Sequence, residues 1–154
     1  MRRYLIVANQ TLDADELGRA VAERSAAGPA EFWVLVPATP TSDMASTAYL
    51  AGMGGVPVVV PSSPAESRAL ARSRLDAALT RLRAAGATAD GEVGDPDPFR
   101  AVEQTLATRQ FDEVVVSTLP ARLSRWLRAD LPSRVRRRFG IPVTHVGASQ
   151  VSSR

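Results

Sequence analysis

The sequence predicts an α/β fold: a doubly wound, five-stranded parallel sheet with helices on both faces. Three observations predict it. Short, continuous apolar runs such as 4–8 and 114–116 are typical of strands that are buried on both faces. Segments with helical periodicity alternate with these runs, as in α/β proteins. The chain has 154 residues, 45% hydrophobic and 23% charged, which is enough for one domain with a buried core.

The first part of the chain has the pattern of a β-α-β unit. The run 4–8 ends in a polar turn, and a segment with one apolar helical face follows, for which Asp13 or Asp15 is the expected N-cap. The second strand, 32–36, ends at Pro37. Two parallel strands joined by a helix predict a right-handed crossover.

A long connection, 38–64, interrupts the alternation and is rich in proline and glycine. A connection of this length in a compact domain is functional or partly disordered. Three interpretations stay open: a flap over a site, an arm that packs on a second subunit, or a tolerated insertion. Its Gly-Met-Gly-Gly sequence lacks the spacing and the strand-then-helix setting of a phosphate-binding loop.

The longest predicted helix begins where Ser63 and Glu66 have the form of a capping box. Its apolar stripe faces inward, most of its arginines lie off that stripe, and Gly86 is expected to end it. The alternating segment 88–93 predicts the third strand.

The last part of the chain contains two further helices and two further strands. Asp97 is expected to be the N-cap of a short helix, with Pro98 as its first residue. The block 111–146 then reads as a buried strand, a basic connector, a helix and a short last strand. Five strands alternating with four helices complete the prediction.

Composition excludes several classes of chemistry. Cysteine is absent, which excludes disulfides, thiolate metal sites and cysteine nucleophiles. All 19 basic residues are arginine, which excludes a Schiff-base lysine and a P-loop lysine.

No apolar run approaches the roughly 20 residues that span a bilayer, and the N-terminal run is too short for a signal peptide. We therefore expect a cytoplasmic protein without a membrane partner.

The order of these elements resembles the universal stress protein family over nearly the whole chain. The resemblance implies a Rossmann-like sheet with strand order 3-2-1-4-5 in a single domain, 1–147, that includes the long loop 38–64 and is followed by a frayed tail, 148–154. Three local features carry it: the turn Ala8-Asn9-Gln10-Thr11, the turn Gly94-Asp95-Pro96 and the closing block 111–146.

The resemblance also implies a ligand crevice at the carboxyl ends of the first and fourth strands. In the nucleotide-binding members of the family an aspartate follows the first strand, where this chain has Asn9. Their adenine pocket uses the end of the second strand, here Val36 and Pro37. The candidate ligand-binding residues are Asn9, Gln10, Val36, Pro37, Ser117, Thr118, Arg122 and Arg125.

The family's glycine-rich signature, G-x2-G-x9-G-[ST], is missing from the connector. Its positions fall on Val116, Leu119, Ala129 and Asp130. Glycines allow backbone N–H groups to approach phosphate oxygens, whereas Leu119 and the following Pro120 fill that space and remove a donor. Asp130 is expected to cap the final helix, and its carboxylate would repel phosphate. We therefore expect no cofactor, and no ATP bound in the family's manner.

The connector also carries arginines three residues apart, at Arg122, Arg125 and Arg128. Two interpretations stay open: an anion clamp near the crevice, or a solvated connector with apolar residues packed beneath it. His145, the only histidine, has neither a second metal ligand nor a serine or acid at triad-like spacing. We predict a structural role for it, and neither a metal site nor catalytic residues.

The leading hypothesis is a non-enzymatic protein, similar to universal stress proteins, that acts through a partner or an unidentified small ligand. The first alternative is a binder of adenine nucleotide or another anion, in which arginines replace the glycine loop. The second is a weak nucleic-acid-associated protein, which an aromatic content of 5% disfavours. The last strand, Pro142–Val146, is an edge strand in the implied order, and we expect a homodimer through it.

Overall fold

A computed structural model of the chain describes residues 1–38, 63–119 and 125–147, with only the backbone of Arg125 and Arg128. Five strands form one parallel sheet in the order β3-β2-β1-β4-β5, which confirms the expected order. The strands are β1 (Arg2–Val7), β2 (Ala30–Pro37), β3 (Thr88–Gly94), β4 (Glu113–Thr118) and β5 (Val143–Gly147).

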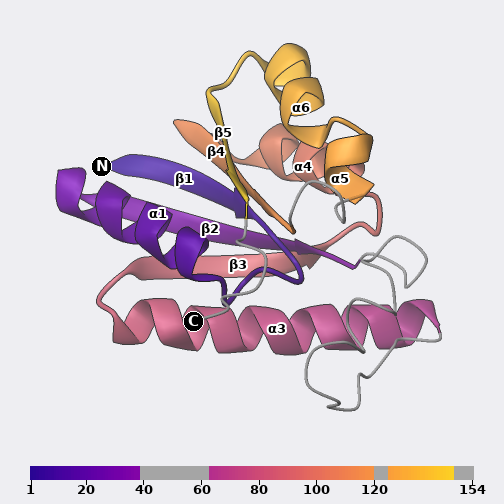
Figure 1. Ribbon diagram of the computed structural model, residues 1–154, viewed down its shortest axis with the longest axis horizontal. Helices are drawn as coiled ribbons and strands as arrows, with labels where there is room; N and C mark the ends of the chain where they lie inside the picture. Colours follow the sequence, from indigo (N-terminus) through magenta and orange to yellow (C-terminus); the bar gives the residue numbers. More distant parts are fainter. Residues whose placement is uncertain (39–62, 120–124, 148–154) are drawn as a thin grey trace.

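Helices cover both faces of the sheet (Figure 1). They are α1 (Asp15–Ala27), α3 (Pro64–Ala84), α4 (Pro98–Thr108), the short α5 (Arg125–Arg128) and α6 (Leu131–Phe139). The α3 helix runs along one side of the sheet, and α4, α5 and α6 gather on the other. The doubly wound α/β architecture is therefore as predicted.

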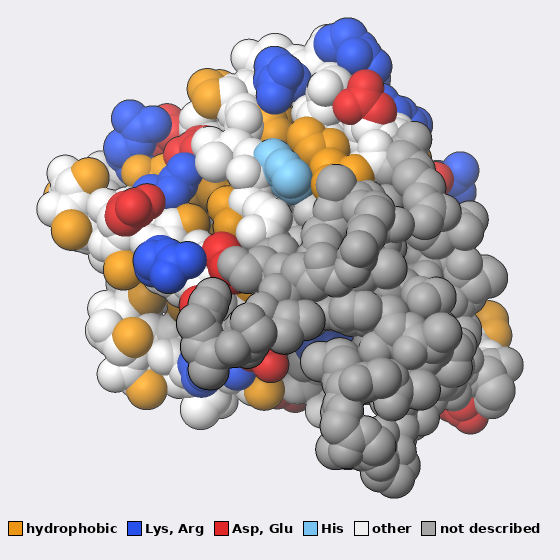
Figure 2. All heavy atoms as spheres, viewed as in Figure 1, with side chains coloured by type: hydrophobic (Ala, Val, Ile, Leu, Met, Phe, Trp, Pro, Cys, Tyr) orange, Lys and Arg blue, Asp and Glu red, His pale blue; other side chains and the backbone are white. Residues whose placement is uncertain are grey.

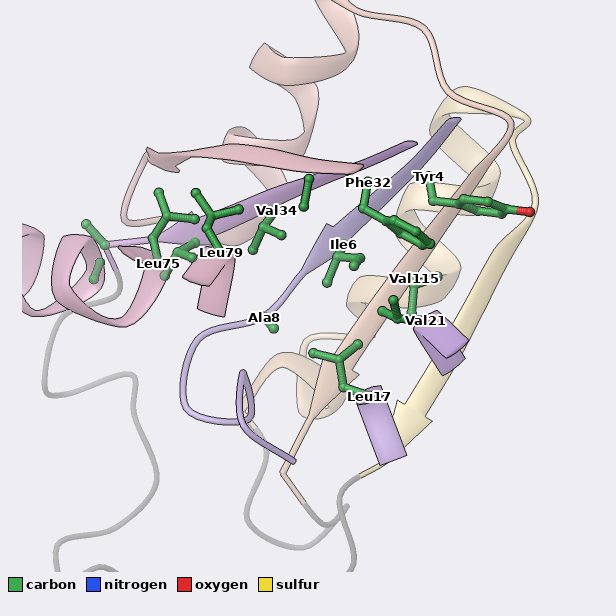
Figure 3. Packing of buried hydrophobic residues seen from close by; sticks show 14 residues of the cluster. Tyr4, Ile6, Ala8, Leu17, Val21, Phe32, Val34, Leu75, Leu79 and Val115 are labelled. Atoms are coloured by element: carbon green, nitrogen blue, oxygen red, sulfur yellow. The ribbon is translucent and has the colours of Figure 1, made fainter. Parts of the chain in front are cut away.

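Alternate residues of the central strands build two separate cores. Ile6, Val34 and Val115 belong to the core beneath α1 and α3; in Figure 3 Leu75 and Leu79 lie beside Val34, and Leu17 lies on the side of Val115. The strand residues between them point to the other face and form a second core with residues of α4 and α6. This core includes Leu5, Val7, Val114 and Val116 of the strands and Val102, Leu131 and Val135 of the helices. A strand whose two faces are both buried reads as a continuous apolar run, which explains the sequence pattern.

Two helix starts agree with the sequence and one does not. The Asp97 side chain accepts hydrogen bonds from the backbone N–H groups of the first turn of α4. The Ser63 hydroxyl accepts from the Glu66 N–H at the start of α3. The prediction for α1 is wrong: its N-cap is Ala14, with no side-chain cap, and Asp15 is already inside the helix. A carboxylate in the first turn still stabilises the helix through its dipole.

A charged network ties α1 to the two last strands. Arg24 of α1 donates to Glu113 of β4 through Nη2–Oε2 (2.7 Å) and Nε–Oε1 (3.1 Å), and Thr144 of β5 donates to the same carboxylate. The hydrogen bond to Glu113 raises the pKa of Arg24. Burial alone would raise the pKa of Glu113, but the hydrogen bonds from Arg24 and Thr144 outweigh it and hold that pKa below its usual value.

Within the described ranges, no helix is both long and apolar enough to cross a membrane. The same part of the chain contains no group of three or more His, Asp or Glu side chains that could hold a metal ion.

Candidate functional site

The candidate site lies where the winding of the sheet reverses. β1 is the central strand, and the chain continues to β2 on one side and returns to β4 on the other. The helices that follow β1 and β4 leave toward opposite faces, and in sheets of this kind ligands bind in the crevice at the carboxyl ends of such strands. The segments that reach this edge include 8–11, 36–38 and 117–118.

Asn9 joins two elements at this edge. Its Nδ2 donates to the backbone oxygen of Pro37 at 2.7 Å, and its Oδ1 accepts from the Arg74 Nη1. The two partners fix the amide orientation, because a carbonyl oxygen only accepts and a guanidinium only donates. An aspartate at this position could not donate to Pro37, whereas asparagine satisfies both partners while buried.

Arg74 brings a positive charge to the crevice from α3. Burial lowers the pKa of Arg74, and the more distant Asp13 carboxylate opposes that effect. Among the described residues no carboxylate lies within ion-pair distance of it, and its hydrogen-bond partner, Asn9, is neutral. A partly desolvated cation that lacks a counter-ion is costly to a protein unless something compensates for it.

Hydroxyl groups form hydrogen bonds at the carboxyl ends of the paired strands β1 and β4. The Thr11 Oγ1 and the Ser117 Oγ lie 2.7 Å apart, and both residues are buried. The Thr118 Oγ1 lies 2.7 Å from the Nε2 of His145 on β5. The first pair joins the loop after β1 to the end of β4, and the second joins β4 to β5, so polar side chains at this edge are hydrogen-bonded to one another.

Six of the eight site residues predicted from the sequence lie at the carboxyl ends of β1, β2 and β4. Val36 and Pro37 are buried at the end of β2, next to Asn9, and Gln10 is partly buried in the turn after it. Ser117 and Thr118 end β4, as described above. Arg122 lies outside the described residues. Arg125 lies in α5, where its side chain is not described, so the anion-clamp interpretation stays a prediction.

The positions of the missing glycine signature do not form a phosphate cradle. Val116 is fully buried in the core beneath α4 and α6. Asp130 is the N-cap residue of α6, but with φ 57° it makes no side-chain cap, contrary to prediction. Its carboxylate instead lies 3.7 Å from the Arg137 Nη1. The described residues at these positions therefore do not fit a triphosphate held by backbone N–H groups.

Sequence reasoning does not single out Arg74, because it places most arginines of this helix off the apolar stripe. The signal was its position relative to the buried stripe. Ala71 and Ala78, three residues before it and four after it, are both buried, as is Leu75. Residues at these spacings share one helical face, so Arg74 lies at the border of the stripe and its stem is drawn inward.

One solved structure places this architecture among known folds. No protein-family model matches the chain, and no curated protein matches its sequence. A universal stress protein family protein from Arabidopsis thaliana, solved with AMP bound, superimposes with a TM-score of 0.58 at 15% sequence identity. The match covers 99% of this chain and 97% of that one. The likeness shows a shared fold.

Proposed function

We propose, from a fold shared with a universal stress protein that was solved with AMP bound, that this chain is a non-enzymatic binding protein for a small anionic ligand. The ligand class is a nucleoside monophosphate or a similar small phosphate ester, bound in the crevice at the carboxyl ends of β1 and β4. Arg74 is the residue that faces the negative charge. The proposal follows the alternative from the sequence in which arginine replaces the glycine-rich loop as the phosphate-binding group, and it assigns Arg74 of α3 to that role.

One observation carries the proposal: a partly buried guanidinium whose hydrogen-bond partner among the described residues is a neutral amide. A phosphate or carboxylate beside Arg74 would supply an adjacent counter-charge, which no described residue provides, in a setting of low dielectric, where such a hydrogen bond is stronger than in water. Val36 and Pro37, at the end of β2, are buried apolar residues near the same point.

The same features disfavour the triphosphate grip of the family's nucleotide-binding members. That grip requires several backbone N–H groups approached without side-chain obstruction, whereas the signature positions hold Val116, Leu119, Ala129 and Asp130. A single arginine suits one phosphate group. Partner-protein binding remains the competing proposal, and weak ligand binding throughout would favour it.

Calorimetry with AMP, inorganic phosphate and magnesium ATP tests the proposal. We expect AMP to bind and to lose about tenfold or more in affinity in Arg74→Gln, since a charged hydrogen bond contributes roughly 1.5–3 kcal/mol. Asn9→Asp should weaken AMP binding as well, because the new carboxylate would pair with Arg74.

Arg72→Gln is the matched control. Arg72 lies on the same helix, is exposed and pairs with Asp76 at 3.6 Å, so its loss should leave AMP binding unchanged. An affinity for AMP that is equal in Arg74→Gln and the wild type would overturn the role of Arg74. Magnesium ATP bound at low micromolar Kd, and insensitive to Arg74→Gln, would overturn the monophosphate proposal and restore the family's grip.

A further inference from the structure

A second pocket lies on the sheet face opposite Arg74. It has a volume of about 440 Å³ and opens between the β3–α4 turn, the first turn of α4, and the segment formed by α5 and the start of α6. That volume is within the range of small-molecule sites, roughly 300–1,000 Å³. The residues that matter for its chemistry are Asp95, Asp97, Phe99, Trp126, Leu131 and Arg134.

One wall of this pocket carries two carboxylates held in place by the backbone. The Asp95 Oδ1 accepts from the Asp97 N–H at 2.9 Å, and the Asp97 Oδ1 accepts from the Phe99 N–H at 2.9 Å. No described residue donates to the Oδ2 atom of either side chain, and neither forms an ion pair within the described ranges. Both carboxylates are therefore oriented and still able to receive a cationic donor.

The opposite wall carries a cation. The Arg134 guanidinium lies over the ring of Phe99, with Cζ 4.3 Å from the ring centroid. Among the described residues it has no carboxylate partner within 4.0 Å. A cation–π contact of this kind does not use the guanidinium N–H donors, which remain available to a carboxylate.

Between these charges the pocket is apolar. Phe99 and Trp126 are partly buried and pack on the core beneath α4 and α6, and Leu131 is almost fully buried. An aliphatic or aromatic group that enters here would lose water from apolar surface, which is the main driving force for small-ligand binding.

A pocket at the amino ends of the strands provides a contrast. It also holds charged side chains, but they pair with one another or with neighbours: Arg3 with Glu31 at 3.4 Å, and Asp90 with Arg83 at 3.6 Å. The Arg109 Cζ there lies over the Trp33 ring, 3.6 Å from its centroid. The carboxylates of that pocket therefore have arginine partners, whereas Asp95 and Asp97 beside Trp126 have none among the described residues.

We infer that the pocket between α4 and α6 binds a free apolar α-amino acid. The ammonium group faces Asp95 and Asp97, the carboxylate faces Arg134, and the side chain packs on Phe99, Trp126 and Leu131. A zwitterion complements both the carboxylates and the guanidinium that lack a described ion-pair partner, whereas a simple amine or a simple carboxylic acid complements only one of them. This site is separate from the crevice at Arg74, so either proposal can fail without the other.

Calorimetry and tryptophan fluorescence test this assignment, with L-phenylalanine, L-leucine and L-tryptophan as calorimetric ligands. The chain has two tryptophans, so Trp33→Phe leaves Trp126 as the only reporter for L-phenylalanine and L-leucine. We expect binding that changes the Trp126 emission. Phenethylamine, which lacks the carboxylate, and 3-phenylpropionate, which lacks the ammonium, should each bind about tenfold or more weakly than L-phenylalanine.

Arg134→Gln should weaken L-phenylalanine binding to the level of phenethylamine, while leaving phenethylamine binding itself unchanged. Arg136→Gln, on the same helix and exposed but not part of the pocket, should have no effect. The assignment is overturned if none of the three amino acids binds with a Kd below roughly 10 mM. It is equally overturned if phenethylamine matches L-phenylalanine in the wild type, or if Arg134→Gln binds L-phenylalanine normally.

Discussion

At the scale of the residue, the Thr118–His145 contact makes the end of β4 sensitive to pH. The imidazole Nε2 lies 2.7 Å from the Thr118 hydroxyl, and His145 lies on the surface shown in Figure 2. Although the residue as a whole is exposed, partial desolvation of its ring lowers the pKa of His145 below its usual value. The neutral imidazole is therefore the form that the fold favours.

The sign of the effect on stability follows from linkage. A histidine whose pKa is lower in the folded state binds protons more readily when unfolded, so the free energy of unfolding rises with pH through that window. We predict that it falls as the pH drops from above about 6.5, the ordinary histidine value, to below the depressed pKa. Urea unfolding at a series of pH values measures this dependence.

His145→Gln provides the control for that experiment. Glutamine removes the titration and can still hydrogen-bond to Thr118, so the difference in pH dependence between variant and wild type belongs to His145. Acidic groups such as Glu113, whose pKa is also depressed, affect both proteins alike at low pH. Parallel curves from pH 7.5 to pH 5.5 would contradict the prediction.

At the scale of the element, β3 depends on a glycine. An ideal Cβ on Gly91 would lie 2.2 Å from the backbone oxygen of Val34 and 2.9 Å from the Leu75 Cδ1. The first contact is with backbone of the adjacent strand, which cannot move without disturbing the ladder. We predict that Gly91→Ala lowers the free energy of unfolding by about 1–3 kcal/mol, as overpacking does.

Gly18→Ala is the matched control, because the same substitution at that position should raise the free energy of unfolding instead of lowering it. Gly18 lies inside α1, and a Cβ on it would meet no atom within 4 Å. Alanine is favoured over glycine in a helix by roughly 1 kcal/mol, so this variant should be more stable than the wild type. Denaturant unfolding of both variants decides the matter, and a neutral Gly91→Ala would show that β2 and β3 can separate locally.

Elements were predictable from the sequence where one local rule determined them. Asp97 followed by Pro98 starts α4 as expected, because an N-cap and a proline at the first helical position act locally. The start of α1 was not predictable in the same way. Asp13 and Asp15 are both suitable N-cap residues by type. The helix instead has Ala14 as its N-cap, and the Ala14 N–H donates to the Thr11 backbone oxygen in the preceding turn.

At the scale of the whole molecule, β5 leaves one edge of the sheet without a described strand beside it. The Val114 N–H donates to the Pro142 oxygen, and parallel ladders alternate. The N–H of Thr144 therefore faces β4, while those of Val143 and His145 face outward. We predict a homodimer through this edge, because unpaired N–H and C=O groups along an edge strand recruit another strand.

His145→Pro tests the dimer, because it removes an outward N–H from the edge and leaves the pairing with β4 intact. Light scattering should give twice the chain mass of 16.4 kDa for the wild type and for His145→Gln, and a lower mass for His145→Pro. A wild-type mass of one chain would rule the dimer out. A Thr144 substitution would be uninformative, since proline there would break the pairing between β4 and β5.

The whole fold was more predictable than the site. Alternating apolar runs and amphipathic segments specify the layers, and family resemblance supplied the strand order. Asn9, Ser117 and Thr118 could be placed at the crevice because the carboxyl ends of neighbouring parallel strands meet at one edge. The position of Arg74 depends on how α3 packs across β2 and β3, which is a tertiary property that local sequence rules do not contain.

The buried amide of Asn9 also bears on how the protein ages. Asparagine is among the residues that degrade by slow chemistry in proteins, and the product of its deamidation is a carboxylate. Here the amide is held between the Pro37 oxygen and the Arg74 guanidinium. Deamidation would set a negative charge against a carbonyl oxygen and neutralise the cation at the crevice. The working life of the proposed binding site is thus linked to the chemical integrity of one side chain.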